Sequence, residues 1–284
     1  MVADPIDLRH LGAERVIGAY VLETDDGPAI FDCGPSSSVE RLKEGLRERG
    51  LELGDVRHLL LSHIHLDHAG AAGVLVREHR DLQVHVSGVG APHLVDPTRL
   101  ERSARRLYGD AFDELWGELA PVPKDNVYVV GETVLGLRCF ATPGHASHHV
   151  CYLDDDGTLY AGDAAGVRVQ PSRAALPPTP PPEFDLDAWQ RTVDEIERRR
   201  PECLALVHFG IAADVERHLD ELRRRLVEWV DRAAAGVTEE EFAQAAREDV
   251  RADGASDADA YERAMPFWQS YAGLKRYVEG RAAA

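Results

Sequence analysis

The chain has 284 residues, of which 44% are hydrophobic and 29% charged, and its formal net charge is −18 because 50 acidic side chains outnumber 32 basic ones. The composition is ordinary for a globular protein, and the length suffices for one large domain with an appendage. The negative charge argues against partners such as nucleic acid or an anionic membrane surface, because those partners attract basic patches. The 13 histidines are the count that suggests chemistry, since neutral imidazole is the commonest metal ligand.

The ends and the cysteines indicate the compartment. The first seven residues are acidic and contain no apolar segment, so no signal peptide is expected, and no stretch approaches the 18 apolar residues of a membrane span. The cysteines, which form no Cys-x-x-Cys pair, are Cys33, Cys139, Cys151 and Cys203. We interpret them as small buried hydrophobic side chains rather than disulfides or redox groups, which predicts a cytoplasmic protein.

The first half of the chain alternates between short apolar runs and amphipathic segments. Strands are predicted at residues 16–22 and 29–32, joined by an Asp-Asp-Gly-Pro turn. Ser37 and Glu40 have the spacing of a capping box, which predicts the start of a helix that ends at Gly50.

A second group of elements precedes a change of pattern. The continuous apolar run at residues 56–61 predicts a strand buried on both faces, followed by a helix at 69–79 and a strand at 82–86. Residues 91–123 then combine helical spacing with bounding prolines, which predicts a helical insertion between strands.

Strand signals resume after the insertion. The predicted strands occupy residues 127–130, 133–140, 149–153, 158–161 and 203–208. Residues 171–182 form a proline-rich loop, and residues 185–200 are predicted to be helical. Many short strands in both halves, each half with its own helices, predict an α/β fold of two packed sheets with helices outside.

The strand signals end near residue 213. We therefore predict a catalytic domain over residues 1–213, which contains the insertion at about 91–123, and a helical extension over residues 214–284. The extension has an apolar face formed by Leu219, Leu222, Leu226 and Trp229. This face could pack on its own domain or join two copies of the chain in a homodimer.

One motif dominates the chemistry of the sequence. The pattern His63-x-His65-x-Asp67-His68 directly follows the buried strand at 56–61 and directly precedes a helix. Four potential metal ligands within six residues at the end of a strand can face one shared space, and such a cluster is rare by chance.

Further side chains of the same kind follow three later strands. These are His145, Asp163 and His208. A glycine precedes the first two, and glycine lets the backbone approach its neighbours closely. The sequence therefore places ligand-type residues at the ends of four strands.

This series resembles the metallo-β-lactamase superfamily, in particular the hydrolase group that includes glyoxalase II and the N-acyl-homoserine lactonases. The resemblance covers roughly residues 10–210 and implies a four-layer αββα sandwich, here with a helical insertion and a helical C-terminal extension. It implies one metal held by His63, His65 and His145, a second held by Asp67, His68 and His208, and Asp163 as a bridge between them. Asp32, at the end of a strand, resembles the superfamily's aspartate that supports a metal ligand from behind; the alternative is an ordinary turn-capping aspartate.

The implied ligand set predicts a reaction. Imidazole and carboxylate ligands suit two divalent ions, zinc first, with iron or manganese also accepted. Two ions would share a hydroxide at neutral pH, and Asp67 would also act catalytically by holding this hydroxide and passing a proton to the leaving group. We therefore expect a dinuclear hydrolase that cleaves an ester-like bond (thioester, lactone or carboxylic ester) of a small acyl substrate.

Two other reactions on the same scaffold are less favoured. One is a mononuclear iron oxidoreductase similar to the sulfur dioxygenases, which use fewer ligands, whereas the complete second set is present here. The other is a phosphodiesterase or nuclease, which the negative charge disfavours.

Candidates for substrate binding come from the insertion and from the His145 segment. Tyr108, Phe112 and Trp116 recur at helical spacing and form either a core stripe or a lid over an apolar substrate, with the prolines at 177–182 as a facing wall. Tyr108 and His148 are the two side chains predicted to line the substrate pocket. The other histidines are interpreted as packed or surface residues: His58, His79, His85, His93, His149 and His218.

Overall fold

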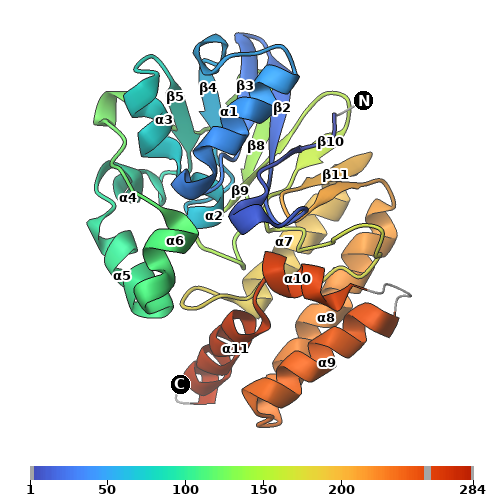
Figure 1. Ribbon diagram of the computed structural model, residues 1–284. Coiled ribbons are helices and arrows are strands. Elements are labelled where there is room, and N and C mark those ends of the chain that lie inside the picture. The colour runs from blue at the N-terminus through green and yellow to red at the C-terminus, as the bar shows by residue number, and fades with distance from the viewer. Residues whose placement is uncertain (1–2, 253–256, 283–284) are drawn as a thin grey trace.

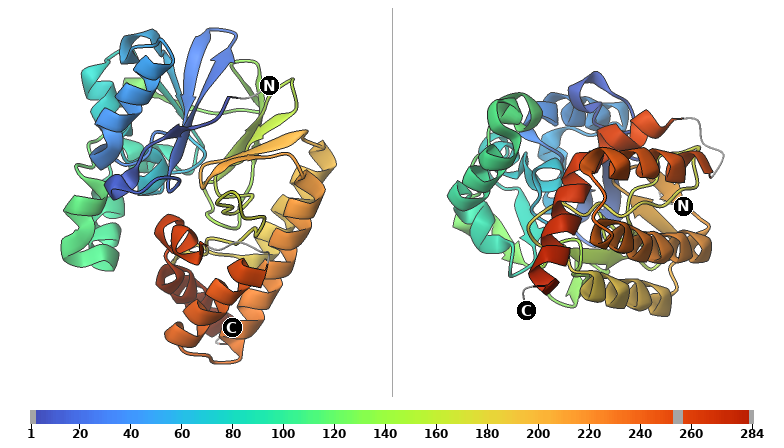
Figure 2. Two further views of the ribbon diagram at one scale, coloured as in Figure 1. Left: turned by 45° about the vertical axis from the view of Figure 1, so that its right-hand side comes forward. Right: turned by 90° about the horizontal axis from the view of Figure 1, so that it is seen from below.

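The structure, a computed structural model, describes residues 3–252 and 257–282. Two six-stranded mixed sheets pack face to face, and helices cover both outer sides (Figures 1 and 2). The strand order is β1-β2-β3-β4-β5-β6 in the first sheet and β12-β11-β10-β9-β8-β7 in the second. This arrangement confirms the α/β sandwich with appended helices that the sequence predicts.

The N-terminal half builds the first sheet. Its strands are β1 (Ile6–Asp7), β2 (Gly18–Thr24), β3 (Gly27–Phe31), β4 (His58–Leu60), β5 (Gln83–Val86) and β6 (Val127–Val129). From β3 to β6 the neighbouring strands run parallel, so their C-terminal ends meet at one edge. Helices α1 (Val39–Glu48) and α3 (Ala72–Glu78) cover the outer face, and the short α2 (Leu66–Ala69) follows β4 at that edge (Figure 1).

The second sheet is built after the insertion. Its strands are β7 (Thr133–Val134), β8 (Leu137–Ala141), β9 (Val150–Leu153), β10 (Thr158–Tyr160), β11 (Cys203–Leu206) and β12 (Gly210–Ala212). Only β10 and β11 pair in parallel among the described strands of this sheet. Helices α7 (Leu186–Arg199) and α8 (Val215–Ala234) pack on its outer face through a shared apolar core.

Buried aromatic side chains join the two sheets. The ring of Phe31 lies 5.9 Å from that of Tyr152 and 5.4 Å from that of Tyr160, so residues of both sheets interlock. The Tyr20 hydroxyl donates a 2.8 Å hydrogen bond to the Leu206 carbonyl, across the sheets. These contacts fix the position of the two sheets relative to each other, and therefore also the position of the loops that follow their strands.

The insertion is helical, as predicted. It contains α4 (Ala91–Val95), α5 (Thr98–Tyr108) and α6 (Phe112–Trp116). The three aromatic residues do not share one helix, because the chain turns at Gly109–Ala111 between α5 and α6. Phe112 is fully buried in a small core beside Leu66, which fits the packing interpretation. Tyr108 and Trp116 instead line a cavity, which fits the lid interpretation.

The C-terminal extension folds against its own chain. After α8 it forms α9 (Glu239–Ala252), α10 (Ala258–Ala264) and α11 (Phe267–Ala282). The predicted apolar face, from Leu219 to Trp229, is fully buried there, and the Trp229 ring lies 5.0 Å from that of Phe242. Among the described helices none is long and apolar enough to cross a membrane. The boundary at residue 213 stays a prediction, as does a homodimer.

Several local expectations were wrong. Ser37 does not cap α1, because its hydroxyl donates instead to the Leu115 carbonyl of the insertion at 2.7 Å. The helix predicted at 69–79 is present as α3 but begins only at Ala72, and the strand predicted at 133–140 is a hairpin of β7 and β8. The short β12 had no signal in the sequence. The remaining short elements are 3-10 turns at His10–Gly12, Ser36–Ser38, Leu53–Asp55, Gly109–Ala111 and Lys124–Asn126.

Candidate metal centre

The seven predicted ligands meet at one edge of the sandwich. His63, His65, Asp67 and His68 follow β4, whereas the others follow strands of the second sheet. Those others are His145 after β8, Asp163 after β10 and His208 after β11. Within this cluster three overlapping groups of side chains have ligand atoms close enough to share an ion: His63 with His65 and His145, His63 with His68 and Asp163, and Asp67 with His68 and His208.

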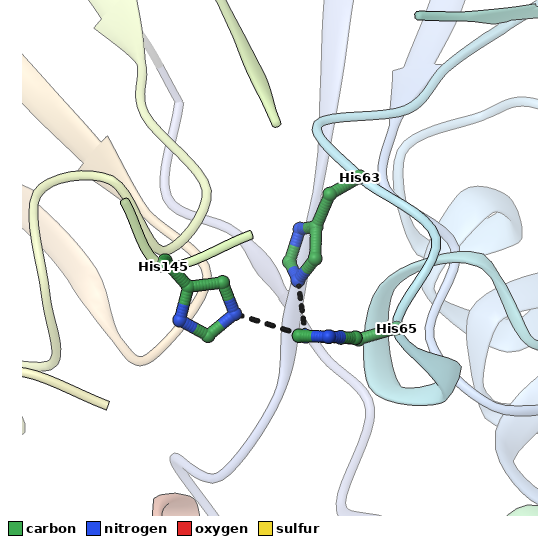
Figure 3. A group of neighbouring side chains, drawn as sticks. All are labelled: His63, His65 and His145. Carbon is green, nitrogen blue, oxygen red and sulfur yellow. Dashed lines mark hydrogen bonds between the residues drawn. The ribbon is translucent and has the colours of Figure 1, made fainter. Parts of the chain in front are cut away.

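The first group consists of three histidines. The Nε2 atoms of His63 and His145 each lie 2.9 Å from Nδ1 of His65 (Figure 3). In Figure 3 the rings of His63 and His145 approach the His65 ring from different sides, each with one nitrogen directed at it, and one ligand atom of each of the three rings lies within 4.8 Å of the other two. Three convergent imidazole nitrogens are a typical donor set for a divalent metal.

The second group combines two histidines with a carboxylate. The Nε2 atoms of His68 and His208 are 3.3 Å apart, and Oδ2 of Asp67 lies 3.7 Å from the first and 3.4 Å from the second. His68 and His208 are buried, while the Asp67 side chain is 25% exposed. The second group could therefore hold an ion that remains reachable beside Asp67.

Asp163 lies between the two groups. Its Oδ2 is 3.3 Å from Nε2 of His145 in the first group, and its Oδ1 is 3.3 Å from Nε2 of His68 and 3.6 Å from Nε2 of His208 in the second. Oδ1 is buried and has no hydrogen-bond partner among the described residues. An unsatisfied buried carboxylate oxygen is costly, and a cation held by the second group would satisfy it. The donor set thus fits two divalent ions with Asp163 shared between them.

Backbone carbonyls orient two of the rings from behind. Nδ1 of His145 donates to the Pro178 carbonyl at 2.8 Å, and Nδ1 of His208 donates to the Val16 carbonyl at 2.5 Å. With the proton on Nδ1, the lone pair lies on Nε2, which is the atom that faces the cluster.

Asp32 supports the other histidines. Its Oδ2 accepts hydrogen bonds from Nδ1 of His68 at 2.8 Å and from the Ser62 hydroxyl at 2.6 Å, while its Oδ1 accepts from the Ser62 N–H at 2.7 Å. The Ser62 oxygen in turn lies 2.9 Å from Nδ1 of His63. Asp32 is fully buried and adopts a left-handed φ of 52°. The structure therefore places Asp32 behind two histidines of the cluster, directly for His68 and through Ser62 for His63, and its support of a metal ligand stays a prediction.

The electrostatics differ between the two groups: burial lowers the pKa values of His63 and His65, whereas the neighbouring carboxylates outweigh burial and raise those of His68 and His208. Burial lowers the pKa of His65 to about 4 and lowers the pKa of His63 well below its ordinary value, so both rings are neutral at pH 7. Burial opposes ionisation of Asp163, but the charges of His68, His145 and His208 together outweigh it and lower the pKa of this carboxyl. The pKa of Asp67 is lowered in the same way. Neutral imidazoles and ionised carboxylates are the forms that bind cations.

Two further histidines near the cluster make contacts that the sequence analysis did not predict. His149, interpreted as a packed residue, accepts the Asp163 N–H on Nε2 at 3.1 Å, and its Nδ1 donates to the Thr142 hydroxyl at 2.7 Å. It therefore holds the backbone of the shared carboxylate. His10, which no motif marks, is buried and stacks on Trp116 at the cavity wall, with ring centroids 5.6 Å apart.

The glycines beside the ligands permit the close approach that the sequence predicts. A Cβ on Gly144 would lie 2.3 Å from Cβ of Trp189. A Cβ on Gly162 would lie 2.6 Å from Cβ of Ser62 and 2.7 Å from Nε2 of His149, and the φ of Gly162 is +49°. No larger residue fits at position 162 without displacing a neighbour of the cluster.

Gly162→Ala is therefore expected to lower the free energy of unfolding by about 2–4 kcal/mol, because overpacking adds to the strain of a left-handed backbone. Urea unfolding followed by circular dichroism measures this change. Gly131→Ala is the matched control, since a Cβ there meets nothing within 4 Å. Equal stability of the two variants would contradict the packing argument.

The cluster opens into a cavity of about 610 Å³. Asp67 and Asp163 line it, as do the predicted candidates Tyr108 and His148. The prolines of the loop after β10 form part of the wall, as the sequence analysis suggests. Contact between Tyr108 or His148 and a substrate stays a prediction.

Comparison with known proteins agrees with this geometry. Residues 14–208 match the family model of the metallo-beta-lactamase superfamily, and the chain belongs to that superfamily of metal-dependent hydrolases. The metallo-beta-lactamase fold-containing protein ST1585 of Sulfurisphaera tokodaii is 26% identical over 219 residues, which are 73% of this chain and 79% of that protein. An N-acyl homoserine lactonase of Bacillus thuringiensis is 25% identical over 159 residues, 47% of this chain and 56% of the lactonase.

A solved structure extends the likeness to the C-terminal helices. The metallo-beta-lactamase family protein TTHA1429 of Thermus thermophilus has a TM-score of 0.67 at 21% identity, over 94% of this chain and 89% of that chain. At this identity the likeness concerns the fold alone.

Proposed function

We propose that this protein is a dinuclear hydrolase that cleaves an ester-like bond, in a thioester, a lactone or a carboxylic ester, of a small acyl substrate. The observation that carries the proposal is the position of Asp163, whose two carboxylate oxygens each face one of the two ligand groups. Its Oδ1 has no hydrogen-bond partner among the described residues. In this proposal His63, His65 and His145 hold one ion, and Asp67, His68 and His208 hold the other. Zinc suits this ligand set best, and iron or manganese is also compatible.

The bound ions would supply Lewis acidity and a hydroxide nucleophile at neutral pH. The chain supplies the group that transfers the proton and the hydrogen bonds that hold the donor atoms in place. Asp67 presents Oδ2 to His68 and His208 and is partly exposed to the cavity, so its other oxygen can take a proton from the nucleophile and release it to the leaving group. The hydrogen bonds from His68 and Ser62 to Asp32 keep the donor atoms in place during this transfer.

The cavity and one relative support an ester-like substrate. A volume of about 610 Å³ lies within the range of small-molecule sites, which is roughly 300–1,000 Å³. The N-acyl homoserine lactonase named above hydrolyses a lactone, according to its name, and shares the superfamily.

We also propose that the protein is located in the cytoplasm. The four cysteines form no disulfide, which fits this location.

Metal analysis combined with hydrolysis assays tests the proposal. We expect two divalent ions per chain, turnover of a thioester, a lactone or an aryl ester, no turnover of a phosphodiester, and loss of turnover after dialysis against a chelator that added zinc reverses. One iron per chain with oxygen uptake on a persulfide would instead identify a sulfur dioxygenase-like enzyme. Turnover of the phosphodiester alone would identify a phosphodiesterase.

A further inference from the structure

The cavity above the metal centre is enclosed by segments that are far apart in the sequence. Besides the cluster itself, its walls come from the turn at His10–Gly12, from α5 and α6 of the insertion, from the proline loop, and from α10 and α11 of the extension. Figure 2 shows the insertion and the C-terminal helices on either side of the open edge of the sandwich. The insertion and the extension thus surround the space in front of the cluster.

The walls of this cavity are predominantly aliphatic and aromatic. Leu66, Leu100 and Leu107 line it on the side of the insertion, and Met265 and Trp268 line it on the side of the extension. Such a surface binds hydrocarbon by removing it from water, at about 25 cal/mol for each Å² that becomes buried.

Exposed apolar side chains gather at the same cavity. Leu11, Val89 and Trp268 are 56%, 55% and 37% exposed, and all three line it. They are three of the six large hydrophobic side chains that are exposed in the described part of the chain. Apolar side chains left open to water around a concave site mark the entrance for an apolar ligand.

One residue joins the two appended segments at this entrance. The Tyr108 hydroxyl, at the end of α5, accepts a 2.9 Å hydrogen bond from Nε2 of Gln269 on α11. The Tyr108 ring also makes edge contacts with Trp268, at 6.4 Å between centroids, and with Trp116, at 5.1 Å. These contacts make a continuous aromatic wall from the insertion to the extension, and Trp268 is its exposed end.

We infer that this aromatic wall, formed by Tyr108, Trp116 and Trp268, is the binding site for the hydrocarbon chain of the acyl substrate. The inference rests on the proposed function and specifies its substrate class: esters or thioesters with a straight acyl chain of several methylenes, rather than acetyl esters. The reactive carbonyl lies at the metal cluster, and the chain extends between α5 and α11 toward Trp268. The C-terminal extension thereby determines specificity.

An ester series tests the length dependence. With acetyl, butyryl, hexanoyl and octanoyl p-nitrophenyl esters, kcat/KM is expected to rise about fourfold for each methylene until the cavity is filled, the factor that ~0.8 kcal/mol for each buried methylene gives. Trp268→Ala is expected to reduce the ratio of octanoyl to acetyl kcat/KM at least tenfold. Val129→Ala, which removes a 60% exposed side chain outside the cavity, should leave this ratio unchanged.

A binding measurement separates the chain site from the chemistry. Isothermal titration of the metal-free protein with 1-octanol and 1-butanol should show at least tenfold tighter binding of 1-octanol, and Trp268→Ala should weaken it. Equal rates for all ester lengths together with equal affinity for both alcohols would overturn this inference and leave the proposed function intact. Tight binding of 1-octanol by a protein that hydrolyses none of the esters would overturn the proposed function and support the chain site.

Discussion

Replacing Asp67 by alanine is expected to reduce the kcat for ester hydrolysis by about 10²–10⁴-fold, the usual contribution of a positioned proton-transfer group. Oδ2 of Asp67 lies 3.4 Å from Nε2 of His208, and the side chain is the most exposed carboxylate of the cluster. In the proposed reaction the substitution removes both a metal ligand and the group that moves the proton.

Asp67→Asn distinguishes these two losses. The amide keeps an oxygen that can face His68 and His208 but cannot accept a proton at neutral pH. We expect this variant to retain most of its metal and still lose turnover, as measured by elemental analysis and steady-state kinetics on the same preparation. Asp110→Ala, which removes an exposed carboxylate of the insertion outside the cavity, is the control and should retain full activity. Full activity of Asp67→Asn would refute the role in proton transfer.

The cluster of candidate ligands could be predicted from the sequence because its members lie just beyond apolar runs. His63 comes shortly after β4 of the first sheet, and the other three, His145, Asp163 and His208, come shortly after β8, β10 and β11 of the second. The position of a polar residue relative to a strand is a local property. It therefore survives errors of one or two residues in the bounds of the strand, such as the late start of β4 at His58.

Other contacts around the cluster could not be predicted, because they join segments that are distant in the sequence. The hydrogen bond from the Asp163 N–H to His149, the stacking of His10 on Trp116, and the contact of Tyr108 with Gln269 follow no spacing rule. The same cause explains the wrong capping box, because the Ser37 hydroxyl donates to a carbonyl of the insertion. From local patterns the extension could pack on its own domain or join two copies of the chain. The tertiary structure is needed to show that α10 and α11 line the cavity.

Asp32→Asn is expected to lower metal affinity by about 10–100-fold, the usual effect of removing a partner behind a histidine ligand. Asparagine tolerates the left-handed φ of 52° at this position, so the backbone can stay as it is. An asparagine oxygen can still accept from the Ser62 N–H, but its amide N–H then opposes Nδ1–H of His68. The His68 ring must then move its proton to Nε2, which removes the lone pair that faces the second group of ligands.

Competition with a chromogenic chelator measures this affinity, and circular dichroism verifies that the variant is folded. Asp26→Asn is the matched control, because Oδ2 of Asp26 lies 3.0 Å from Nε2 of the buried His58, a carboxylate–imidazole contact away from the cluster. This control should bind metal as tightly as the unchanged protein. If Asp32→Asn also binds metal with full affinity, Asp32 is a turn-capping residue, and the tautomer of His68 is fixed by the metal itself rather than by the chain.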